Sequence, residues 1–408
     1  MTVTTDPVGQ DKGWRQVPLR YVAKCLDGQR IPLNSEERSF RSGPYPYWGA
    51  NGIVDYIDDY IFDEQLVLLG EDGAPFFDPL KPVAFAVEGK IWVNNHIHVL
   101  RVRDDYDFRY VAACLNVADY SLWIEGSTRD KLTQDNMLRI GIHSPPKERQ
   151  TQIAQFLDKE TADIDALIAA KQKLLDLMAE KRRAIVAEAV MRGLDPSAPL
   201  RPSGIDWLGE IPAHWEVERS RWLFSERDQR SQTGEEEMLT VSHLTGVTPR
   251  SEKDVNMFEA ESTAGYKLCF AGDLAINTLW AWMGAMGTAR VDGIVSPAYN
   301  VYTPGPRLLP DYVDALVRIP VFAQEVTRYS KGVWSSRLRL YPEGFFETWW
   351  PVPPLDEQQQ IVEHISTETA KIDRLRTATE NSIALLKERR AALIAAAVTG
   401  QLEIPEAA

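Results

Sequence analysis

Asp78, Glu88 and Lys90 are the residues whose types and spacing could carry out chemistry in this chain. Two carboxylates followed by a lysine occur in metal-dependent nucleases, where the acids hold Mg²⁺ and the lysine stabilises the attacking water. The pattern is loose, and such spacing arises often by chance. Gly89 suits the turn of a β-hairpin, because glycine adopts the left-handed backbone conformation that tight turns require. We therefore favour a hairpin over a nuclease at this position.

Other catalytic and metal-binding signatures are absent from the sequence. There is no Walker-type Gly-x-x-x-x-Gly-Lys-Ser/Thr segment, and the six histidines form no His-Glu-x-x-His or comparable metal site. Cys25, Cys114 and Cys269 lack Cys-x-x-Cys spacing and predict reduced thiols. Because the chain shows neither a signal-like N-terminal segment nor an apolar run of membrane-spanning length, we expect a cytoplasmic protein.

An internal repeat dominates the organisation of the chain. Residues 145–194 align without a gap with residues 353–402, and 20 of the 50 aligned positions are identical. Each copy opens with Pro-Pro, continues for more than 40 residues without proline or glycine, and is rich in strong helix formers. Apolar residues recur at three- and four-residue spacing. The pattern predicts two helices, 145–193 and 353–402, each roughly 65 to 70 Å long and packed along the other.

The segments before each helix predict two matching globular domains. Trp14 and Arg20 match Trp215 and Arg221, and a later Gly-x-x-x-x-Lys/Arg-Leu segment aligns Lys131-Leu132 with Arg337-Leu338. The predicted order is a tail (1–13), a domain (14–144), the first helix (145–193), a Pro- and Gly-containing connector (194–214), a second domain (215–352), the second helix (353–402) and a tail (403–408).

Within the domains the pattern is mixed α/β. Residues 45–52 predict an aromatic loop, and residues 82–87 and 91–99 predict a hairpin closed near Gly89. Further strands are expected at 53–56, 66–69, 238–241, 273–278 and 294–302. The middle parts of the two domains cannot be aligned with each other by sequence.

Together these features resemble the specificity subunit of type I restriction-modification systems, over Trp14 to about Leu402. The resemblance rests on the two-half plan, the Pro-Pro and Gln-x-Gln-Ile helix starts, and three segments: Pro46–Ile53, Gly70–Gly73 and Asn277–Gly284. It implies two mixed α/β (α+β) target-recognition domains that each read half of a split site in double-stranded DNA. It also implies two long antiparallel helices that form a coiled-coil-like spacer with a pseudo-twofold internal repeat. Two modification subunits, which methylate adenine N6, would dock on this scaffold, and restriction subunits can join them.

No methyltransferase motif is present in the chain itself. The Asn/Asp-Pro-Pro-Tyr/Phe element is missing, because the only Pro-Pro pairs begin the two helices. We therefore expect a noncatalytic chain without a cofactor of its own, with S-adenosylmethionine on the modification subunit, and a fused single-chain enzyme is disfavoured. The formal charge of −14 predicts weak unspecific DNA binding without a partner. The alternative from another class is a coiled-coil assembly scaffold whose globular ends bind protein instead of DNA.

Candidate DNA-contacting residues are polar, cationic or aromatic side chains in expected loops, which offer donors to phosphates and base edges. In the first domain they are Asn51, Lys90, Asn94, Asn95, His96, Ser127, Thr128, Arg129 and Lys131. In the second they are His243, Trp280, Trp282, Ser296, Tyr299, Ser335, Ser336, Arg337 and Arg339. The cations could instead form an ordinary solvated surface, and a core position for Trp280 and Trp282 is at least as plausible as a contact.

Overall fold

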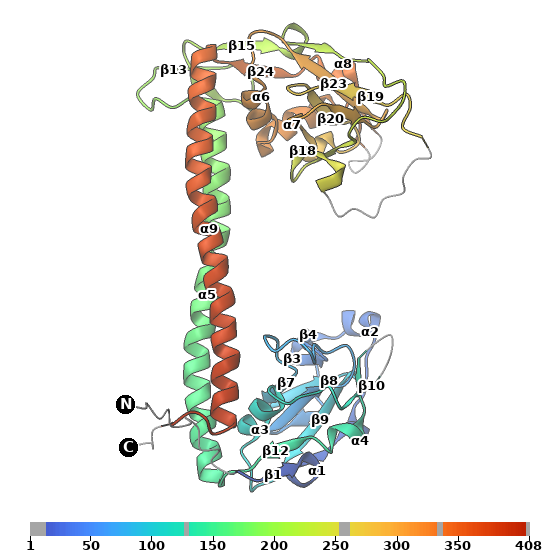
Figure 1. Ribbon diagram of the computed structural model, residues 1–408, viewed down its shortest axis with the longest axis vertical. Helices are drawn as coiled ribbons and strands as arrows, with labels where there is room; N and C mark the ends of the chain where they lie inside the picture. The colour runs from blue at the N-terminus through green and yellow to red at the C-terminus, as the bar shows by residue number, and fades with distance from the viewer. Residues whose placement is uncertain (1–13, 126–129, 253–261, 333–337, 405–408) are drawn as a thin grey trace, which may run out of the picture. The chain divides into compact units, whose positions relative to one another are not determined.

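The structure is a computed structural model that describes residues 14–125, 130–252, 262–332 and 338–404. The chain divides into two compact units, which are unit 1 (Met1–Lys173 with Thr379–Ala408) and unit 2 (Leu174–Ala378). Each unit combines one globular part with segments of two long helices, α5 (Lys147–Arg192) and α9 (Leu355–Val398) (Figure 1). The two helices begin two residues after the start of their Pro-Pro pairs.

Two expectations about the class of protein can be compared with the described residues. Neither the long helices nor any shorter helix within the described ranges has the length and apolar character needed to cross a lipid bilayer. All three cysteines are free thiols, as predicted, and Cys114 and Cys269 are buried.

The globular part of unit 1 consists of short strands and helices. Its strands are β1 (Gln16–Pro18), β2 (Ala23–Cys25), β3 (Ser42–Gly49), β4 (Gly52–Ile57), β5 (Phe62–Asp63), β6 (Leu66–Gly70), β7 (Ala84–Val87), β8 (Lys90–Val93), β9 (Ile97–Val102), β10 (Ile124–Glu125), β11 (Lys131–Leu132) and β12 (Gly141–His143). Its helices are α1 (Leu19–Val22), α2 (Ser35–Ser39), α3 (Phe108–Leu115) and α4 (Gln134–Met137), with a 3₁₀ turn η1 (Asp27–Gln29).

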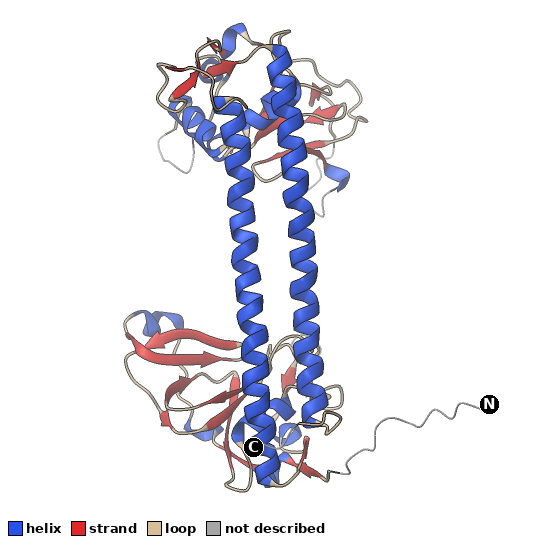
Figure 2. Cartoon of the chain, turned by 90° about the vertical axis from the view of Figure 1, so that its left-hand side faces the viewer, coloured by secondary structure: helices blue, strands red, loops and turns tan. Residues whose placement is uncertain are grey.

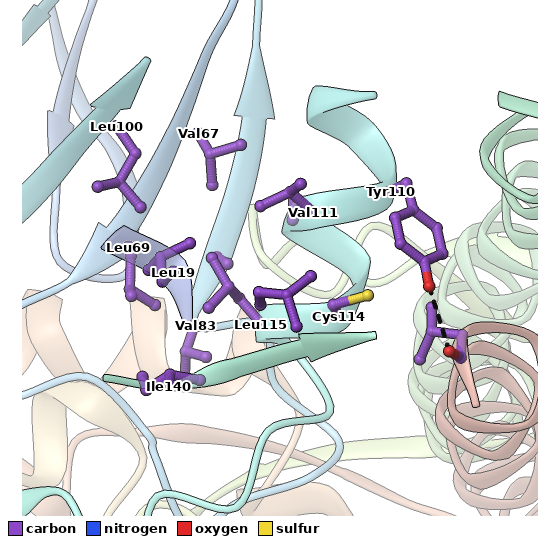
Figure 3. Close-up of a cluster of buried hydrophobic side chains, with 14 of the residues drawn as sticks. Leu19, Val67, Leu69, Val83, Leu100, Tyr110, Val111, Cys114, Leu115 and Ile140 are labelled. Atoms are coloured by element: carbon purple, nitrogen blue, oxygen red, sulfur yellow. Dashed lines mark hydrogen bonds between the residues drawn. The ribbon is translucent and has the colours of Figure 1, made fainter. Parts of the chain in front are cut away.

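The central sheet of unit 1 is antiparallel, with the strand order β2-β9-β6-β7. Successive side chains of a strand point to opposite faces. Leu66 and Leu68 of β6 therefore pack in one apolar cluster, and Val67 and Leu69 pack in another. Helix α3 contributes Tyr110, Val111, Cys114 and Leu115 to the second cluster (Figure 3). Burial on both faces explains the uninterrupted apolar run of β6.

Two expectations about the strands of unit 1 are wrong. Residues 45–52 do not form a loop throughout, because β3 extends to Gly49 and pairs with β4 and β8. Residues 82–87 and 91–99 do not form a hairpin, because β7 pairs with β6, whereas β8 pairs with β3 and β5. Gly89 does make a turn at φ +87°, but this turn leads the chain from one sheet into another.

The globular part of unit 2 follows a similar plan. Its strands are β13 (Leu200–Pro202), β14 (Glu210–Pro212), β15 (Glu216–Arg219), β16 (Phe224–Glu226), β17 (Leu239–Ser242), β18 (Gly246–Pro249), β19 (Lys267–Cys269), β20 (Leu274–Asn277), β21 (Met286–Thr288), β22 (Gly293–Val295), β23 (Tyr299–Pro304) and β24 (Trp349–Val352). Its helices are α6 (Pro310–Val317), α7 (Pro320–Tyr329) and α8 (Pro342–Phe345), with 3₁₀ turns η2 (Ser220–Trp222), η3 (Arg250–Glu252) and η4 (Ala281–Met283).

The central sheets of the two units are equivalent. The order β16-β23-β20-β21 in unit 2 reproduces β2-β9-β6-β7 in unit 1. In unit 1 the pairing of β6 with β9 ends at Gly70 and Ile97, and in unit 2 the pairing of β20 with β23 ends at Asn277 and Tyr299. The next helix along the chain, α3 or α6, packs into the core on one face of its sheet. The structure therefore aligns the middle parts of the two domains, which the sequence does not.

Within each unit the two long helices run side by side in opposite directions (Figure 2). In unit 1, Arg390 pairs with Asp165 at 2.9 Å, and Arg149 donates to the carbonyl of Ile404 at 3.0 Å. In unit 2, Arg182 lies 3.6 Å from Asp373. The two ion pairs occupy matching positions of the sequence repeat, with the roles of the helices exchanged. The predicted antiparallel pairing is confirmed.

A buried tyrosine ties each globular part to the end of a long helix. The hydroxyl of Tyr110 lies within hydrogen-bond distance of the carbonyls of His143 (3.0 Å) and Val398 (3.3 Å), at the end of α9 (Figure 3). Tyr312 repeats this arrangement with the carbonyls of Pro351 (3.4 Å) and Val190 (3.3 Å), at the end of α5. Each globular part therefore packs against the start of one long helix and the end of the other.

The segment 194–214 is more than the connector that its prolines and glycines predict. Strands β13 and β14 within it pair with each other, and Trp207, Leu208 and Ile211 are buried in the main apolar cluster of unit 2. Proline and glycine indicate the turns of this segment correctly, but they say nothing about the side chains between them. The segment is part of the core of unit 2.

Candidate DNA interface

In unit 1, four loops meet at one end of the central sheet. We call residues 48–52, 70–73, 94–96 and 130–132 loop cluster 1. Backbone hydrogen bonds join these loops: the amide of Asn94 donates to Trp48 O at 3.0 Å, that of Glu71 to His96 O at 3.0 Å, and that of Leu132 to Glu71 O at 2.7 Å. Segments far apart in the sequence thus form one surface.

Loop cluster 1 brings together five of the predicted site residues. Asn51 and Asn95 are exposed, and the Asn51 amide donates to Gly73 O at 3.3 Å. The side chain of Asn94 accepts from the amide of His96 at 2.8 Å. His96 Nδ1 lies 2.7 Å from a carboxylate oxygen of Asp72, and half-exposed Lys131 lies 3.4 Å from Glu71. These side chains present amide and ammonium donors of the kind that read base edges or hold phosphates.

A buried ionic network lies beneath loop cluster 1. His98 is 1% exposed, and its Nδ1 lies 2.6 Å from Asp27 while its Nε2 lies 2.9 Å from Leu132 O. Both ring nitrogens of His98 therefore lie within hydrogen-bond distance of an oxygen. Arg30 adds a cation, 2.6 Å from Glu71. The network connects the sheet to the loops above it.

The pKa of Asp27 reflects this network. Burial acts to raise the pKa of its carboxyl group, but the hydrogen bond and charge of His98, the amide of Val99 and the charge of Arg30 outweigh it. The pKa is therefore held below the usual value for aspartate. Ligand atoms of Asp27, Glu71 and His98 lie within 4.8 Å of one another, as in some metal sites. Because His98 already uses both nitrogens and Arg30 occupies Glu71, these contacts favour ion pairing over metal binding.

The structure does not assemble the three residues with nuclease-like spacing. Asp78 pairs with Lys81 at 3.0 Å, and Glu88 accepts a hydrogen bond from Gln65 at 3.1 Å. The ammonium of Lys90 lies 4.6 Å from the ring centroid of Tyr60 and 5.7 Å from that of Tyr45, away from loop cluster 1 at the start of β8. Lys90 thus makes cation–π contacts with aromatic rings.

We expect that the purified chain does not cleave DNA in the presence of Mg²⁺, and that Lys90→Ala leaves this behaviour unchanged. The reason is that the three side chains contact different partners and share no metal position. A plasmid-nicking assay with and without Mg²⁺ checks this expectation. Mg²⁺-dependent cleavage by the wild-type chain that disappears in Lys90→Ala would show that the nuclease hypothesis is right.

Unit 2 carries an equivalent surface at the same end of its sheet. We call residues 277–284, 296–299 and 338–341 loop cluster 2. The hydroxyl of Thr278 joins its loops, since it donates to Ala298 O at 2.8 Å and accepts from Nε of Arg339 at 3.1 Å. The amide group of Asn277 lies 3.2 Å from the hydroxyl of Tyr299, whose pKa is raised by burial. Trp280, Trp282, Ser296, Tyr299 and Arg339, all predicted site residues, belong to this cluster.

The exposure of the two tryptophans distinguishes between the alternatives for them. Trp280 is 49% exposed, so a core position is wrong for it, whereas its neighbour Ala281 is fully buried. Trp282 is partly buried and donates from Nε1 to Leu279 O at 3.0 Å. His243, in the turn between β17 and β18, is exposed and lines a groove together with Trp282.

Six predicted site residues lie outside the described residues, namely Ser127, Thr128, Arg129, Ser335, Ser336 and Arg337. The structure also corrects the sequence alignment of their loops. Leu132 donates to Glu71 O directly after β6, and Leu340 donates to Thr278 O directly after β20. Lys131-Leu132 is therefore equivalent to Arg339-Leu340, two residues later than the sequence match to Arg337-Leu338 predicts.

The buried network of unit 1 is the part of the site that the sequence analysis misses. The position of His98 on β9 is occupied by Asn300 on β23, because each pairs with the penultimate residue of the central strand. Asn300 accepts a hydrogen bond from the ammonium of Lys267, which is 6% exposed, at 3.3 Å. A buried basic side chain thus lies beneath each cluster, His98 in unit 1 and Lys267 in unit 2. In the sequence, this network is indicated only by the Gly70–Gly73 segment, which contains Glu71.

Comparisons with known proteins agree with this two-part architecture. Residues 11–176 match the family model of the Type I restriction modification DNA specificity domain. A Haemophilus influenzae protein, named as a type I restriction enzyme specificity subunit, is 35% identical over 154 residues, which cover 38% of this chain and 38% of that protein. The EcoDI specificity subunit of Escherichia coli is 19% identical over 417 residues, which cover 95% of this chain and 88% of that protein.

A solved structure shows the same fold. It comes from work on the assembly and conformational transition of the type I R-M system, and it covers 97% of this chain and 100% of the matched chain, with a TM-score of 0.66 and 16% identity. The family model accounts for the first half, and the EcoDI relative and the shared fold extend the likeness to the second half. Residues 11–176 therefore carry the match to the type I DNA specificity domain, and over both halves the chain is similar to specificity subunits of type I restriction-modification systems.

Proposed function

We propose that this chain reads a two-part DNA sequence for a type I restriction-modification complex and performs neither methylation nor cleavage itself. One observation carries the proposal: two equivalent sheets present loop clusters at the same end, but with different side chains. Glu71, His98 and Lys131 in unit 1 are replaced by Thr278, Asn300 and Arg339 in unit 2. A repeated scaffold with unlike contact residues is suited to reading two unlike half-sites.

The side chains of the clusters support direct readout of bases. Asparagine pairs through two hydrogen bonds with the major-groove edge of adenine, and lysine or arginine pairs with that of guanine. Asn51 and Asn95 in unit 1 are exposed. Lys131 and Arg339 occupy equivalent positions and are each fixed by a neighbouring side chain. Anchored cations lose less side-chain freedom on binding than free ones do.

The proposal includes partners that supply what this chain lacks. A net charge of −14 disfavours binding to a phosphate backbone, so modification subunits are expected to contribute phosphate contacts as well as catalysis. We propose that two such subunits dock on the chain, one for each half of the repeat, and that S-adenosylmethionine binds to them. The paired helices are proposed to set the number of base pairs between the half-sites.

Exchange of one domain tests whether the two halves read DNA separately. Residues 14–144 are replaced by the corresponding domain of another specificity subunit, with a tyrosine kept at position 110 to preserve its bond to Val398 O. We expect that only one half of the methylated sequence changes, because unit 2 keeps its own loops. Adenine-methylation mapping in cells that express the chimera with the modification subunit gives the result. Exchange of residues 215–352 is the matched control and should change only the other half of the methylated sequence. If either exchange changes both halves of that sequence, the two domains do not read DNA separately.

A further inference from the structure

The turn after β20 carries three large apolar side chains that the fold buries only in part. Leu279 and Trp280 are each 49% exposed, and Met283 is 37% exposed. Grouped exposed apolar residues mark surfaces that bind something, because leaving them in water is unfavourable. The equivalent loop of unit 1, Gly70–Gly73, contains no aromatic residue. The two loop clusters therefore differ in chemistry at the same position of the sheet.

The backbone holds this turn in one conformation. The amide of Trp280 donates to Asn277 O, and that of Met283 donates to Trp280 O, both at 3.0 Å. Ala281 is fully buried and anchors the middle of the turn, and Gly284 ends it at φ +85°, which favours glycine. The apolar side chains project from a preorganised support, so little conformational freedom is lost when they insert into a partner.

Positive charge lies beside the turn. A groove of about 840 Å³ in unit 2, lined by Trp282, Met283 and His243, has four arginines and two aspartates among its lining residues: Arg182, Arg183, Arg290, Arg318, Asp311 and Asp314. The groove of about 570 Å³ in unit 1 has three cations and three acids: Lys81, Lys387, Arg390, Asp78, Asp119 and Asp165. Three of these arginines are ion-paired with an aspartate: Arg290 with Asp311 at 2.8 Å, Arg318 with Asp314 at 3.7 Å and Arg182 with Asp373 at 3.6 Å. The groove therefore has a small excess of positive charge on a chain of net charge −14, and its guanidinium groups are complementary to phosphate.

We propose that Trp280, with Leu279 and Met283, is a wedge that inserts between bases of the half-site read by unit 2, while the neighbouring arginines hold the phosphates. Apolar side chains inserted in this way unstack a base step and bend the duplex, and the unstacking energy is offset by the contacts that the bend permits. Tryptophan in addition stacks on a base face. The inference rests on the proposed DNA-reading function and adds how one half of the site is recognised.

The test compares two exposed tryptophans of unit 2. Trp280→Ala removes the wedge, and Trp222→Ala is the matched control, because Trp222 is 73% exposed but lies on η2. The full chain with its modification subunit is titrated with duplexes that contain the DNA sequence that the complex methylates. Each duplex carries one 2-aminopurine, placed at successive positions of each half-site. This base fluoresces more strongly when it is unstacked.

We expect the wild-type and Trp222→Ala complexes to raise the fluorescence at one step of the half-site read by unit 2. Trp280→Ala should lose this rise and bind about ten-fold more weakly, and Trp280→Phe should restore part of both. An unchanged rise in Trp280→Ala overturns the wedge and leaves the reading function intact. Another outcome is that the Trp280→Ala chain no longer binds the modification subunit, and that a high concentration of this subunit restores normal DNA distortion. The apolar turn would then be a binding surface for the modification subunit, which also overturns the wedge. A wild-type complex without any site-specific methylation overturns both proposals.

Discussion

Insertion of four residues into each long helix, within residues 170–178 of α5 and the facing 377–385 of α9, is expected to change the spacing between the two half-sites and leave both half-sites unchanged. Each helix gains about 6 Å, because an α-helix rises about 1.5 Å per residue. This length corresponds to about one to two base pairs of DNA. The insertions lie between the ion pairs Asp165–Arg390 and Arg182–Asp373, so both units keep their own contacts.

Adenine-methylation mapping of the insertion variant checks this result. The matched control replaces the same residues by other helix formers without changing the length, and it should methylate the wild-type sequence. A wild-type spacer in the insertion variant would contradict the proposal that the helices set the spacing. Loss of one half-site would show that an insertion had disturbed a unit instead.

Asp27→Asn is expected to have the largest effect on stability among substitutions near the site. Its carboxylate is the closest partner of His98, at 2.6 Å, and both side chains are shielded from solvent. The substitution leaves Glu71, 3.9 Å away, as the nearest carboxylate to the buried His98 nitrogen, and loss of such a buried hydrogen-bond partner costs about 1–3 kcal/mol. Unfolding by denaturant, followed with a probe placed in unit 1, measures the loss. DNA binding should fall as well, because His98 holds Leu132 in loop cluster 1.

The matched control for this substitution is Asp228→Asn. Asp27 and Asp228 follow equivalent residues, since Leu26 donates to Val99 O and Arg227 donates to Val301 O. The Asp228 side chain is 62% exposed, so solvent screens its ion pairs with Arg230 (3.1 Å) and Lys267 (3.9 Å) and its replacement should cost no more than about 1 kcal/mol. Equal effects of the two substitutions would show that the buried pair contributes nothing special.

The effect of Asp27→Asn has a defined pH dependence. The pKa of Asp27 is lower in the folded chain than its usual value. The ionised carboxylate therefore stabilises the fold at pH values above the pKa that Asp27 has in the unfolded chain. This contribution is lost as the pH falls through the pKa that Asp27 has in the folded chain. The difference between wild type and Asp27→Asn is therefore expected to be full at neutral pH and to shrink below about pH 4.

The parts of the fold that depend on local patterns are predictable from the sequence. Both long helices follow from proline- and glycine-free runs with helical spacing, and their pairing follows from the duplication, which places Asp165 and Asp373 at matching positions. Helix formation depends on residues a few positions apart, so a single sequence contains the necessary information.

The parts that depend on long-range pairing are not predictable in this way. The sequence correctly predicts a turn at Gly89. It does not predict that β8 pairs with β3 and β5, because no local pattern indicates these partners. The alignment of Lys131 with Arg339 becomes visible only through the bonds of Leu132 and Leu340 to the ends of their sheets. The network of Asp27, Glu71 and His98 likewise joins residues that are far apart in the chain, and their types alone do not distinguish a buried network from a solvated surface.

Genome-wide mapping of adenine methylation in cells that express this chain with its modification subunit tests the central claim most directly. Two unlike loop clusters on one repeated scaffold predict a single methylated sequence made of two different halves, separated by a constant number of unread base pairs. One continuous sequence, or the absence of any methylated sequence that depends on this chain, would contradict the account.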